Sequence, residues 1–523
     1  MTTGHASVPV ASGAGLAAQL GRRRRGRPDS VVLRFDRPWT AAELGELSDR
    51  LAARLVAAGV GRGDRVVVML PNDVWWPASL VALSRIGAVV VPANHAYRST
   101  DLHHVIDDSG ARLVIASRDG GRVASELDLG RALQLVSFDA PVDPGVADWS
   151  DVASDPPPPD LGELPGPDDL CSLQYTSGTT GFPKACMLTH RYWEQVGGIA
   201  ADHASLGPDD VILVAAPFSY MDPQWNLMAA LMSGATLVVL PRFSPSTFWQ
   251  AVRDHEVTWC YMVGTMPVFL ANLPAGPDDT RHRLRFVTCS GIVPALHGEF
   301  ERRWGVPWRE AFGMTETGVD LACGFDDDWT VGTGHLGSVV PGKEIRLVDD
   351  TGVVTGPGSG ELQVRGQPMM LGYWNRPESE QVIDSEGWLH TGDLATRTDD
   401  SVLRLTGRLK DMIRRAGENV AAAEVEAVLV QHPSITAAAV VGVPDEARGE
   451  EVKAFVVRSN ADLTADEVHV FAAERLAAFK VPRYVQFVEA FPLTSSERVA
   501  KHLLVHGDTW DAARRFDSAP PSP

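Results

Sequence analysis

Along the chain, segments with apolar residues at helical spacing alternate with short runs that are almost wholly apolar. Residues 40–59 (TAAELGELSDRLAARLVAAG) predict a helix that begins behind a threonine cap, and residues 63–70 (GDRVVVML) predict a short buried strand. The same order recurs in residues 79–94 (SLVALSRIGAVVVPAN) and in the segment that ends with ARLVIAS at 111–117. Alternation of this kind indicates parallel strands connected by crossover helices.

The pattern changes twice further along the chain. A second α/β run covers about 210–320, and short strands with glycine turns follow between roughly 330 and 405. After Leu409 the order becomes helix, strand, strand, helix. We therefore expect an α/β fold with a large N-terminal α/β domain, containing two parallel-type sheets and a small β-rich subdomain, and a small mobile α+β C-terminal domain. The expected boundaries are a flexible tail at 1–27, the large domain at 28–408, the small domain at 409–511 and a flexible tail at 512–523.

Composition places the protein among globular chains with more than one domain. Its 523 residues are too many for one ordinary core, and 44% of them are hydrophobic while 22% are charged. The formal net charge of -20 argues against a protein that coats nucleic acid or anionic membranes. A negatively charged ligand must therefore be bound by local structure, against the overall field of the protein.

The cysteine pattern and the N-terminal segment favour a cytoplasmic protein. The five cysteines are widely spaced and show no CxxC motif or zinc-ligand spacing, which fits a reducing compartment better than a disulfide framework. The first 27 residues place RRRRGR after a weak apolar stretch, the reverse of the order in a secretory signal. No run approaches the roughly 18 apolar residues that a membrane-spanning helix needs.

The segment YTSGTTGFPK at 175–184 has the composition of an anion-binding loop that follows a strand. Gly178 and Gly181 allow backbone N–H groups to converge on an oxygen, and side-chain hydroxyls add further donors. Lys184 adds a positive charge. The hydroxyl-bearing residues are Thr176, Ser177, Thr179 and Thr180. The segment does not fit the Walker A pattern G-x-x-x-x-G-K-[ST].

Five motifs in a fixed order resemble the adenylate-forming (AMP-binding) superfamily, which includes acyl-CoA synthetases, nonribosomal peptide adenylation domains and luciferases. They are YTSGTTGFPKACMLTH at 175–190, FGMTETG at 312–318, GYW at 372–374, GWLHTGDLA at 387–395 and GRLKDMIRRAGENVAAAEVE at 407–426. Together they cover nearly the whole chain after the N-terminal tail. The nearest branch by this resemblance is that of crotonobetaine/carnitine-type CoA ligases.

The resemblance implies how the chain binds ATP and Mg²⁺. The Thr176–Lys184 loop would hold the β- and γ-phosphates, Thr315 would contact the α-phosphate, and Glu316 would be the Mg²⁺ ligand. A carboxylate oxygen is the kind of ligand that this hard cation prefers. Asp393 would accept hydrogen bonds from the ribose hydroxyls, with Arg408 beside the same sugar.

The implied reaction has two halves. The acid attacks the α-phosphorus of ATP in line, which gives an acyl adenylate and pyrophosphate, and the protein contributes positioning and charge stabilisation. In most of the superfamily the acyl group then passes to a thiol, of CoA or of a carrier protein, after the small domain turns about a hinge. The hinge position is Lys410, and the RRAGEN segment with Gly417 resembles the backbone that lines the thiol path.

The C-terminal motif departs from the pattern of the superfamily. Relatives usually carry P-x-T-x-x-G-K, whose lysine bridges the carboxylate and the α-phosphate, whereas this chain has PLTSSERVAKHLL with Arg498 in place of that lysine. Arginine keeps the charge but not the compact ammonium. Three explanations are open: Arg498 substitutes at a reduced rate, Lys501 takes over through a register slip, or the first step does not need this lysine.

The segment PFSYMDPQWN at 217–226 and the residues around Gly291 are expected to form the wall that contacts the acyl group. Tyr220 replaces the histidine that relatives often show, and a carboxylate at Asp222 beside an indole at Trp225 suits a cationic or amino-bearing substrate. A surface turn around Pro223 is the alternative. The opposite wall is expected from Gly291, Ile292, Gly313 and Met314, where a glycine lets a flat ring approach the backbone.

The sequence as a whole predicts an ATP- and Mg²⁺-dependent ligase that converts a small aryl or short polar carboxylic acid to its CoA thioester through an acyl-AMP. One alternative is a diazotase of natural-product biosynthesis, which would activate nitrite with ATP and diazotise an aromatic amine. Another is a nucleotide-binding protein without catalysis. The intact phosphate loop, Glu316 and Asp393 argue against the last.

Overall fold

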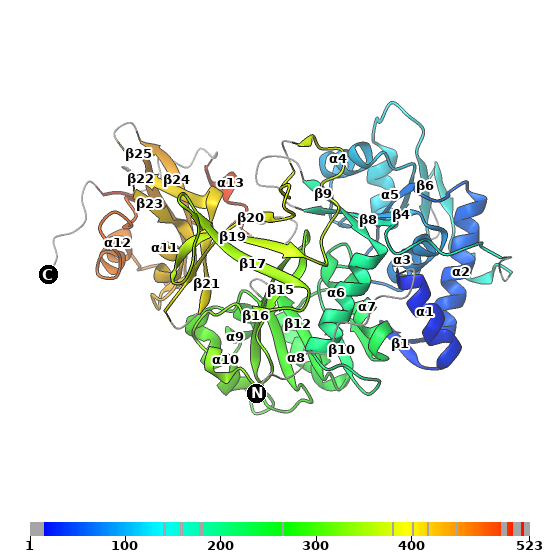
Figure 1. Cartoon of the computed structure of the whole chain (residues 1–523), viewed down its shortest axis with the longest axis horizontal. Helices are drawn as coiled ribbons and strands as arrows, with labels where there is room; N and C mark the ends of the chain where they lie inside the picture. Colours follow the sequence, from blue (N-terminus) through cyan, green and yellow to red (C-terminus); the bar gives the residue numbers. More distant parts are fainter. Residues whose placement is uncertain are drawn as a thin grey trace. The chain divides into compact units, whose positions relative to one another are not determined.

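The computed structural model divides the chain into two compact units (Figure 1). The N-terminal unit comprises Met1–Glu344 with Val364–Leu389, and the C-terminal unit comprises Ile345–Gln363 with His390–Pro523. The structure describes residues 15–139, 143–156, 158, 160–176, 183–263, 266–378, 381–399, 402–415, 418–445, 448–492, 499–505 and 514–516. This division into two units differs from the domain boundary expected between residues 408 and 409, because the strands between 343 and 408 form one sheet. The hinge expected at Lys410 stays a prediction.

The first sheet of the N-terminal unit is the seven-stranded one that the early helix–strand alternation predicts. Its strand order is β7-β6-β5-β3-β4-β8-β9, and every neighbouring pair is parallel except β8 and β9. The strands are β3 (Arg65–Met69), β4 (Val89–Pro92), β5 (Leu113–Ala116), β6 (Gln134–Ser137), β7 (Val146–Asp148), β8 (Leu170–Thr176) and β9 (Lys184–Thr189). The helices along this part of the chain are α2 (Ala41–Ala57), α3 (Trp75–Ile86), α4 (Ser99–Ser109) and α5 (Arg118–Ser125).

The second sheet of the N-terminal unit has nine strands in the order β16-β15-β14-β13-β12-β10-β11-β1-β2. Its centre is parallel and both edges are antiparallel, so the predicted α/β class is confirmed with mixed rather than purely parallel sheets. The strands are β1 (Val31–Arg34), β2 (Pro38–Thr40), β10 (Val211–Val214), β11 (Thr236–Val239), β12 (Trp259–Val263), β13 (Phe286–Ser290), β14 (Trp308–Met314), β15 (Gly318–Ala322) and β16 (Ser338–Val339). The helices are α6 (His190–His203), α7 (Met221–Ser233), α8 (Pro245–Asp254), α9 (Met266–Ala271) and α10 (Pro294–Trp304).

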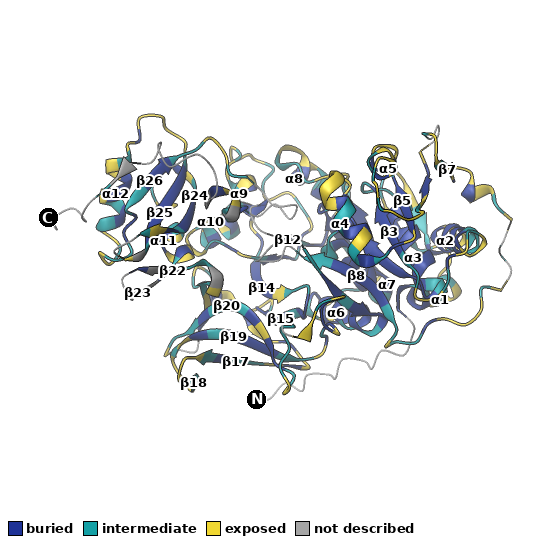
Figure 2. Cartoon of the chain, turned by 90° about the horizontal axis from the view of Figure 1, so that it is seen from above, coloured by how far each residue is buried: buried dark blue, intermediate teal, exposed yellow. Residues whose placement is uncertain are grey.

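Side-chain alternation along the strands builds three cores from these two sheets. On β3, Val66 and Val68 belong to the core that also contains residues of α3, α6 and α7, whereas Val67 and Met69 belong to the core with α4. On the other sheet, Leu213 packs into a third core with α8 and α10. Helices α3, α6 and α7 therefore lie between the two sheets, where Figure 2 shows a buried interior.

The C-terminal unit contains a five-stranded and a six-stranded sheet. The first has the order β18-β17-β19-β20-β21. Its strands are β17 (Lys343–Asp349), β18 (Gly352–Val353), β19 (Gly358–Gly366), β20 (Leu389–Arg397) and β21 (Leu403–Arg408). The elements of the second sheet and its helices are β22 (Met412–Arg415), β23 (Glu418–Ala421), α11 (Ala422–Leu429), β24 (Ile435–Asp445), β25 (Gly449–Arg458), α12 (Ala465–Ala473), β26 (Tyr484–Phe487), α13 (Lys501–Val505) and β27 (Arg514–Arg515). The helix–strand–strand–helix order predicted after Leu409 is present.

The flexible tails expected at the two ends are wrong for part of each. Gly15–Gly26 form helix α1, which packs on α2, α3, α6 and α7, and the side chains of Leu16 and Leu20 are buried there. At the other end, Arg514–Arg515 pair with β26 and the ring of Phe516 stacks on His469 at 4.0 Å. A search of the described residues finds no helix with the length and apolar character needed to cross a membrane.

Helix α1 is held in place by an arginine of the N-terminal segment that was expected to be a flexible tail. The guanidinium of Arg23 is buried and donates to the carbonyl oxygens of Ala230 at 2.8 Å, Ala235 at 2.7 Å and Val31 at 2.7 Å. Burial, together with the charge of Arg27, lowers the pKa of Arg23 to about 10. Arg23 thus links helix α1 to the end of α7, to the residue that precedes β11 and to the start of β1.

We predict that Arg23→Ala lowers the free energy of unfolding by about 3 kcal/mol, because three buried carbonyl groups lose a charged donor. Chemical denaturation followed by circular dichroism measures the change. The exposed neighbour Arg25 gives a matched control, and Arg25→Ala should shift the same free energy by less than about 0.5 kcal/mol. Equal effects of the two substitutions would contradict this role of Arg23.

Candidate active site

The predicted phosphate loop connects two antiparallel strands, β8 and β9. Thr176 ends β8 and pairs with Lys184 at the start of β9, and the Thr176 hydroxyl donates to the Lys184 carbonyl at 3.4 Å. Five residues predicted to bind phosphate, Ser177, Gly178, Thr179, Thr180 and Gly181, lie outside the described residues. The hairpin therefore fixes both ends of the loop, and Lys184 lies at its base.

The GYW motif lies against the same hairpin. The Leu371 amide donates to the Met187 carbonyl at 2.9 Å, and the Trp374 amide donates to the Ala185 carbonyl at 2.9 Å. Between them, the Tyr373 ring lies 5.4 Å from the Lys184 ammonium, within the range of a cation–π interaction. The GYW motif is thus an extra strand-like segment that supports β9 from its other edge.

Glu316 is tied to this frame through Tyr373. The Glu316 side chain is buried, and one of its carboxylate oxygens accepts a hydrogen bond from the Tyr373 hydroxyl at 2.8 Å. In the same motif, the carbonyl of Thr315 accepts from the Tyr192 hydroxyl at 2.8 Å. A Cβ at Gly313 would come within 1.9 Å of the Gly318 carbonyl, so the backbone of this turn requires glycine there.

This donor set fits Mg²⁺ bound together with phosphates. A carboxylate oxygen at Glu316, fixed by a phenol, is a hard ligand beside a loop that carries a lysine. Among the described residues there is no cluster of three or more acidic, histidine or cysteine side chains that would hold a metal ion alone. Mg²⁺ commonly binds through one or two carboxylates and takes its other ligands from water and substrate phosphates.

A buried ion pair supports the Thr315–Gly318 turn from behind. The ammonium of Lys343 lies 3.2 Å from the Asp320 carboxylate and donates to the carbonyls of Thr317, at 2.7 Å, and Pro368. The hydroxyl of Thr317 donates to Asp320 at 2.5 Å. Each member of this pair is thus hydrogen-bonded as well as paired, which is the condition under which a buried charge is tolerated.

The expected acyl-group wall begins with helix α7. Tyr220 precedes the helix and its hydroxyl accepts from the Asn94 amide at 3.1 Å. Asp222 is half-buried in the first turn, and Trp225 is buried with its indole N–H 3.3 Å from the Asp222 carboxylate. Pro223 lies inside the helix and is buried. The alternative of a surface turn around Pro223 is therefore wrong.

The opposite wall is held by a carboxylate that the sequence analysis missed. Glu310 on β14 accepts from the backbone amides of Gly291, at 2.7 Å, and Ile292, at 2.8 Å. Gly291 has φ +90°, and a side chain built there would point into open space. Ser290 donates to the Ala311 carbonyl at 2.5 Å. Burial raises the pKa of the Glu310 carboxyl to about 7, although the two backbone hydrogen bonds act in the opposite direction.

Other residues missed from the sequence fix the turn that precedes α7. Asn72 donates to the carbonyls of Ala216, at 3.0 Å, and Leu240, at 2.9 Å, and accepts from the Phe218 amide at 2.9 Å. Gln174, just before the phosphate loop, donates to the Ser219 carbonyl at 2.7 Å. The available signal was position alone: Gln174 immediately precedes the phosphate-loop motif, and Glu310 stands two residues before FGMTETG.

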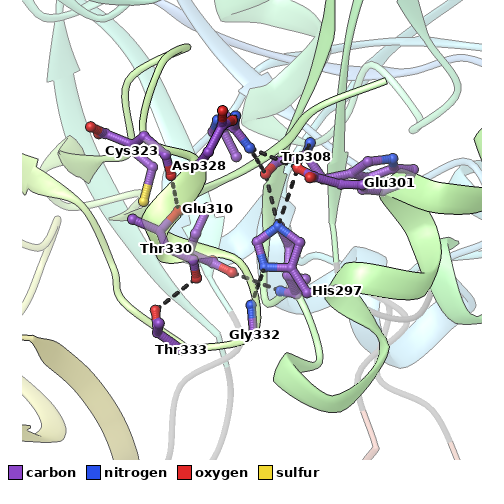
Figure 3. Close-up of polar contacts among 12 residues, drawn as sticks. His297, Glu301, Trp308, Glu310, Cys323, Asp328, Thr330, Gly332 and Thr333 are labelled. Carbon is purple, nitrogen blue, oxygen red and sulfur yellow. Dashed lines mark hydrogen bonds and ion pairs between the residues drawn. The ribbon is translucent and has the colours of Figure 1, made fainter. Parts of the chain in front are cut away.

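Strand β14, which carries FGMTETG, is anchored by a polar cluster on α10 (Figure 3). The Nδ1 atom of His297 accepts from the Gly332 amide at 3.3 Å, so the proton lies on Nε2, which donates to the Trp308 carbonyl at 2.9 Å. Burial lowers the pKa of His297 and favours this neutral form. The buried guanidinium of Arg309 donates to Glu301 at 2.7 Å. Contacts with α10 thus hold Trp308 and Arg309, the two residues that precede Glu310 on β14.

The remaining predicted residues belong to the C-terminal unit. Asp393 is buried on β20, where it pairs with Arg408 of β21 at 2.7 Å. Lys501 begins α13, and its ammonium lies 2.7 Å from Glu426 and 3.8 Å from Asp411. Lys410 lies in the short turn Leu409–Asp411. Two predicted residues, Arg498 and Gly417, lie outside the described residues.

Comparisons with known proteins agree with this arrangement. The AMP-binding enzyme family matches residues 20–374, and the AMP-binding enzyme C-terminal domain matches residues 424–498. A feruloyl-CoA synthase from Amycolatopsis sp. is 35% identical over 498 residues, which cover 93% of this chain and 98% of the relative. Among solved structures, ATP-bound MatB from Rhodopseudomonas palustris has a TM-score of 0.84 at 28% identity, covering 93% of this chain and 98% of that one. A benzoate CoA ligase from Burkholderia xenovorans LB400 has a TM-score of 0.84 at 26% identity, covering 94% and 99%.

The fold and the site together define an AMP-forming ligase of the acid–thiol type. The chain belongs to the AMP-binding enzyme family, as both its large N-terminal match and its C-terminal match show. The general resemblance drawn from the five motifs is therefore confirmed.

We predict that the KM for the acid rises as the pH falls through about 7, because Glu310 then takes up a proton and loses one of its two acceptor oxygens. Glu310→Gln resembles the protonated form, and should raise this KM about tenfold and remove its pH dependence. The KM for ATP should not change. Initial rates of ATP–pyrophosphate exchange at several pH values measure both constants.

The exposed Glu299 on α10 provides the control for this experiment. Glu299→Gln should keep the wild-type pH profile. A Glu310→Gln enzyme that retained that profile would show that Glu310 does not position the Gly291–Ile292 turn.

Proposed function

We propose that the chain converts a small aryl carboxylic acid to its CoA thioester. The reaction uses ATP and CoA as co-substrates and Mg²⁺ as the metal. The acid is first adenylated with release of pyrophosphate, and the acyl group then passes to the CoA thiol. The observation that carries the aryl assignment is the expected acyl-group wall, in which Trp225 and Tyr261 meet edge to face at 5.0 Å. The Tyr261 hydroxyl lies 2.7 Å from that of Ser290, and the space beside the next residue, Gly291, is open. Relatives named for feruloyl and benzoate substrates support it.

Each predicted site residue keeps its role within this proposal. The Thr176–Lys184 loop binds the terminal phosphates, Thr315 contacts the inner phosphate, and Glu316 holds Mg²⁺, which neutralises phosphate charge when bound. Asp393 and Arg408 bind the ribose. The C-terminal segment is a lid that turns about Lys410, and Gly417 lies along the thiol path. These roles rest on the motifs and on the contacts around Tyr373.

The structure bears on the three explanations for the altered C-terminal motif. Lys501 would have to leave Glu426 and Asp411 to reach a nucleotide, and burial of Glu426 makes loss of its partner costly. This argues against Lys501 as the catalytic cation. Substitution by Arg498 and a first step that needs no lysine both stay open.

The relatives do not favour the rival functions. None of those reported above is named as a diazotase or as a protein without catalysis, and none is named for crotonobetaine or carnitine. A carrier protein as the thiol acceptor and a cytoplasmic location belong to the proposal. The location is supported by five buried cysteines without disulfides.

The direct test is a substrate panel. Pyrophosphate release is measured with aryl and short aliphatic acids, with and without CoA, and separately with nitrite and arylamines. We expect an aryl acid to drive ATP–pyrophosphate exchange and to give a CoA thioester only when CoA is present. Activity that required nitrite and an arylamine without CoA would replace this proposal with the diazotase.

We predict that Lys184→Ala raises the KM for ATP about tenfold or more, because the base of the phosphate loop loses its positive charge. Tyr373→Phe removes only the hydroxyl that positions Glu316, so it should raise the Mg²⁺ concentration needed for half-maximal rate and leave the KM for the acid unchanged. Titrations of ATP and of Mg²⁺ at saturating acid measure these effects. A rise in the acid KM alone would contradict the assignment of Lys184 to the phosphates.

A further inference from the structure

Helix α4 is bonded to both ends of the predicted phosphate loop (Figure 1). At the end of the incoming strand β8, the hydroxyl of Tyr175 donates to the Asp108 carboxylate at 2.7 Å. At the other end of the loop, the Nε2 atom of His104 donates to the carbonyl of Pro183 at 2.9 Å. Pro183 directly precedes Lys184, the cation at the base of the loop. One helix therefore holds the chain just before and just after the segment expected to bind phosphate.

The helix that carries these two side chains is a firm support. His104 and Asp108 are one helical turn apart on α4, so their side chains leave the same face of the helix. Another face of α4 is buried in the core shared with strands β3, β4 and β5, through Leu102, Val105 and Ile106. A side chain that leaves a packed helix is placed more precisely than one that leaves a loop.

Asp108 is also held by the segment around the GYW motif. Its second carboxylate oxygen accepts from Arg376 at 2.8 Å, and its backbone carbonyl accepts from the indole N–H of Trp374 at 3.1 Å. The side chains of Asp108 and Arg376 are only 9% and 18% exposed, so water and salt screen their charges weakly. The carboxylate is therefore fixed in the direction from which it accepts the Tyr175 hydroxyl.

Both donors keep the protons that these bonds need. Burial, and after it the hydrogen bond to Asp108, raises the pKa of the Tyr175 phenol, so this hydroxyl stays a donor. The His104 ring bonds to a carbonyl oxygen, which only accepts, so the proton of this bond lies on Nε2. The rings of His104 and Tyr175 meet edge to face at 5.9 Å, which joins the two bonds into one cluster.

We propose that His104 and Asp108 are positioning residues for ATP, which hold the two ends of the phosphate loop where the loop can bind the terminal phosphates. This inference rests on the proposed function, since it requires that the Thr176–Lys184 loop binds those phosphates. Neither residue lies in any of the five motifs, so the resemblance to the superfamily gives them no role.

The physical reason is the entropy of closing a loop on an anion. A peptide loop loses conformational entropy when several of its N–H groups turn toward one phosphate, and each end that is fixed beforehand lowers this cost. The effect is confined to the phosphates that the loop contacts. AMP lacks the β- and γ-phosphates, so the support from α4 should matter for ATP and not for AMP.

The experiment compares the binding of ATP and AMP to matched variants. Isothermal titration calorimetry with Mg²⁺ present, and without any acid or CoA, measures the Kd of each nucleotide. Tyr175→Phe removes only the hydroxyl that bonds to Asp108, and His104→Phe keeps a ring beside Tyr175 but removes the N–H donor. Each variant should raise the Kd for ATP about three- to tenfold and leave the Kd for AMP within about twofold of wild type.

Neighbouring residues on α4 provide the controls. The Nε2 atom of His103 bonds to the Asp128 carbonyl, outside the loop, at 3.3 Å, so His103→Phe should change neither constant by more than about twofold. His104→Gln keeps an N–H donor and should return the Kd for ATP to within about twofold of wild type. Asp108→Asn should raise the Kd for ATP, whereas Asp107→Asn, at an exposed position, should not.

The outcomes distinguish this inference from the proposed function. An unchanged Kd for ATP in both Tyr175→Phe and His104→Phe, or an equal rise for ATP and AMP, overturns the positioning role and leaves the ligase chemistry intact. Lys184→Ala is measured in parallel, and an unchanged Kd for ATP in that variant overturns the assignment of the loop to the terminal phosphates itself.

Discussion

The hydrogen bond from the Tyr373 phenol to the buried Glu316 carboxylate connects those parts of the proposed nucleotide-binding site that lie in the N-terminal unit. Tyr373 is held because the residues around it pair with β9, the strand that leaves the phosphate loop. The Lys184 ammonium lies over the same ring. Tyr373 therefore contacts both the cation proposed to bind phosphate and the carboxylate proposed to bind the metal, and the backbone around Tyr373 is held by a single hairpin.

Single side chains, the buried Glu310 and the half-buried Asn72, hold the turns from which the proposed acyl-group wall is built. Glu310 takes two amides of the Gly291–Ile292 turn, and Asn72 takes two carbonyls and one amide from chain segments that follow β10 and β11. Such turns lie beyond the ends of the strands, where the sheet ladder no longer satisfies backbone groups. A side chain that bonds to these backbone groups in place of a neighbouring strand also fixes the positions of the residues proposed to form the wall.

Periodicity and motif order made much of the fold predictable, and two of the failures share one cause. The helix expected at 40–59 and the strand at 63–70 appear as α2 and β3, with Thr40 and Glu43 forming a capping box. The segment that contains Arg23 was expected to be a flexible tail, because its charge alone does not show that Arg23 donates to buried carbonyl groups. Glu310 was missed for the same reason. Its partners are backbone amides, which leave no trace in the sequence.

The distribution of acidic groups also limits which acids suit the proposed site. The protein carries a net charge of -20, and two carboxylates, Asp222 and Glu310, stand at the proposed acyl-group wall, whereas the described cation of the phosphate loop is Lys184 at its base. A substrate with one carboxylate can place it toward the nucleotide and its neutral end toward the wall. A diacid would have to bring its second anionic group next to Asp222 in a partly buried setting, where like charges repel more strongly than in water.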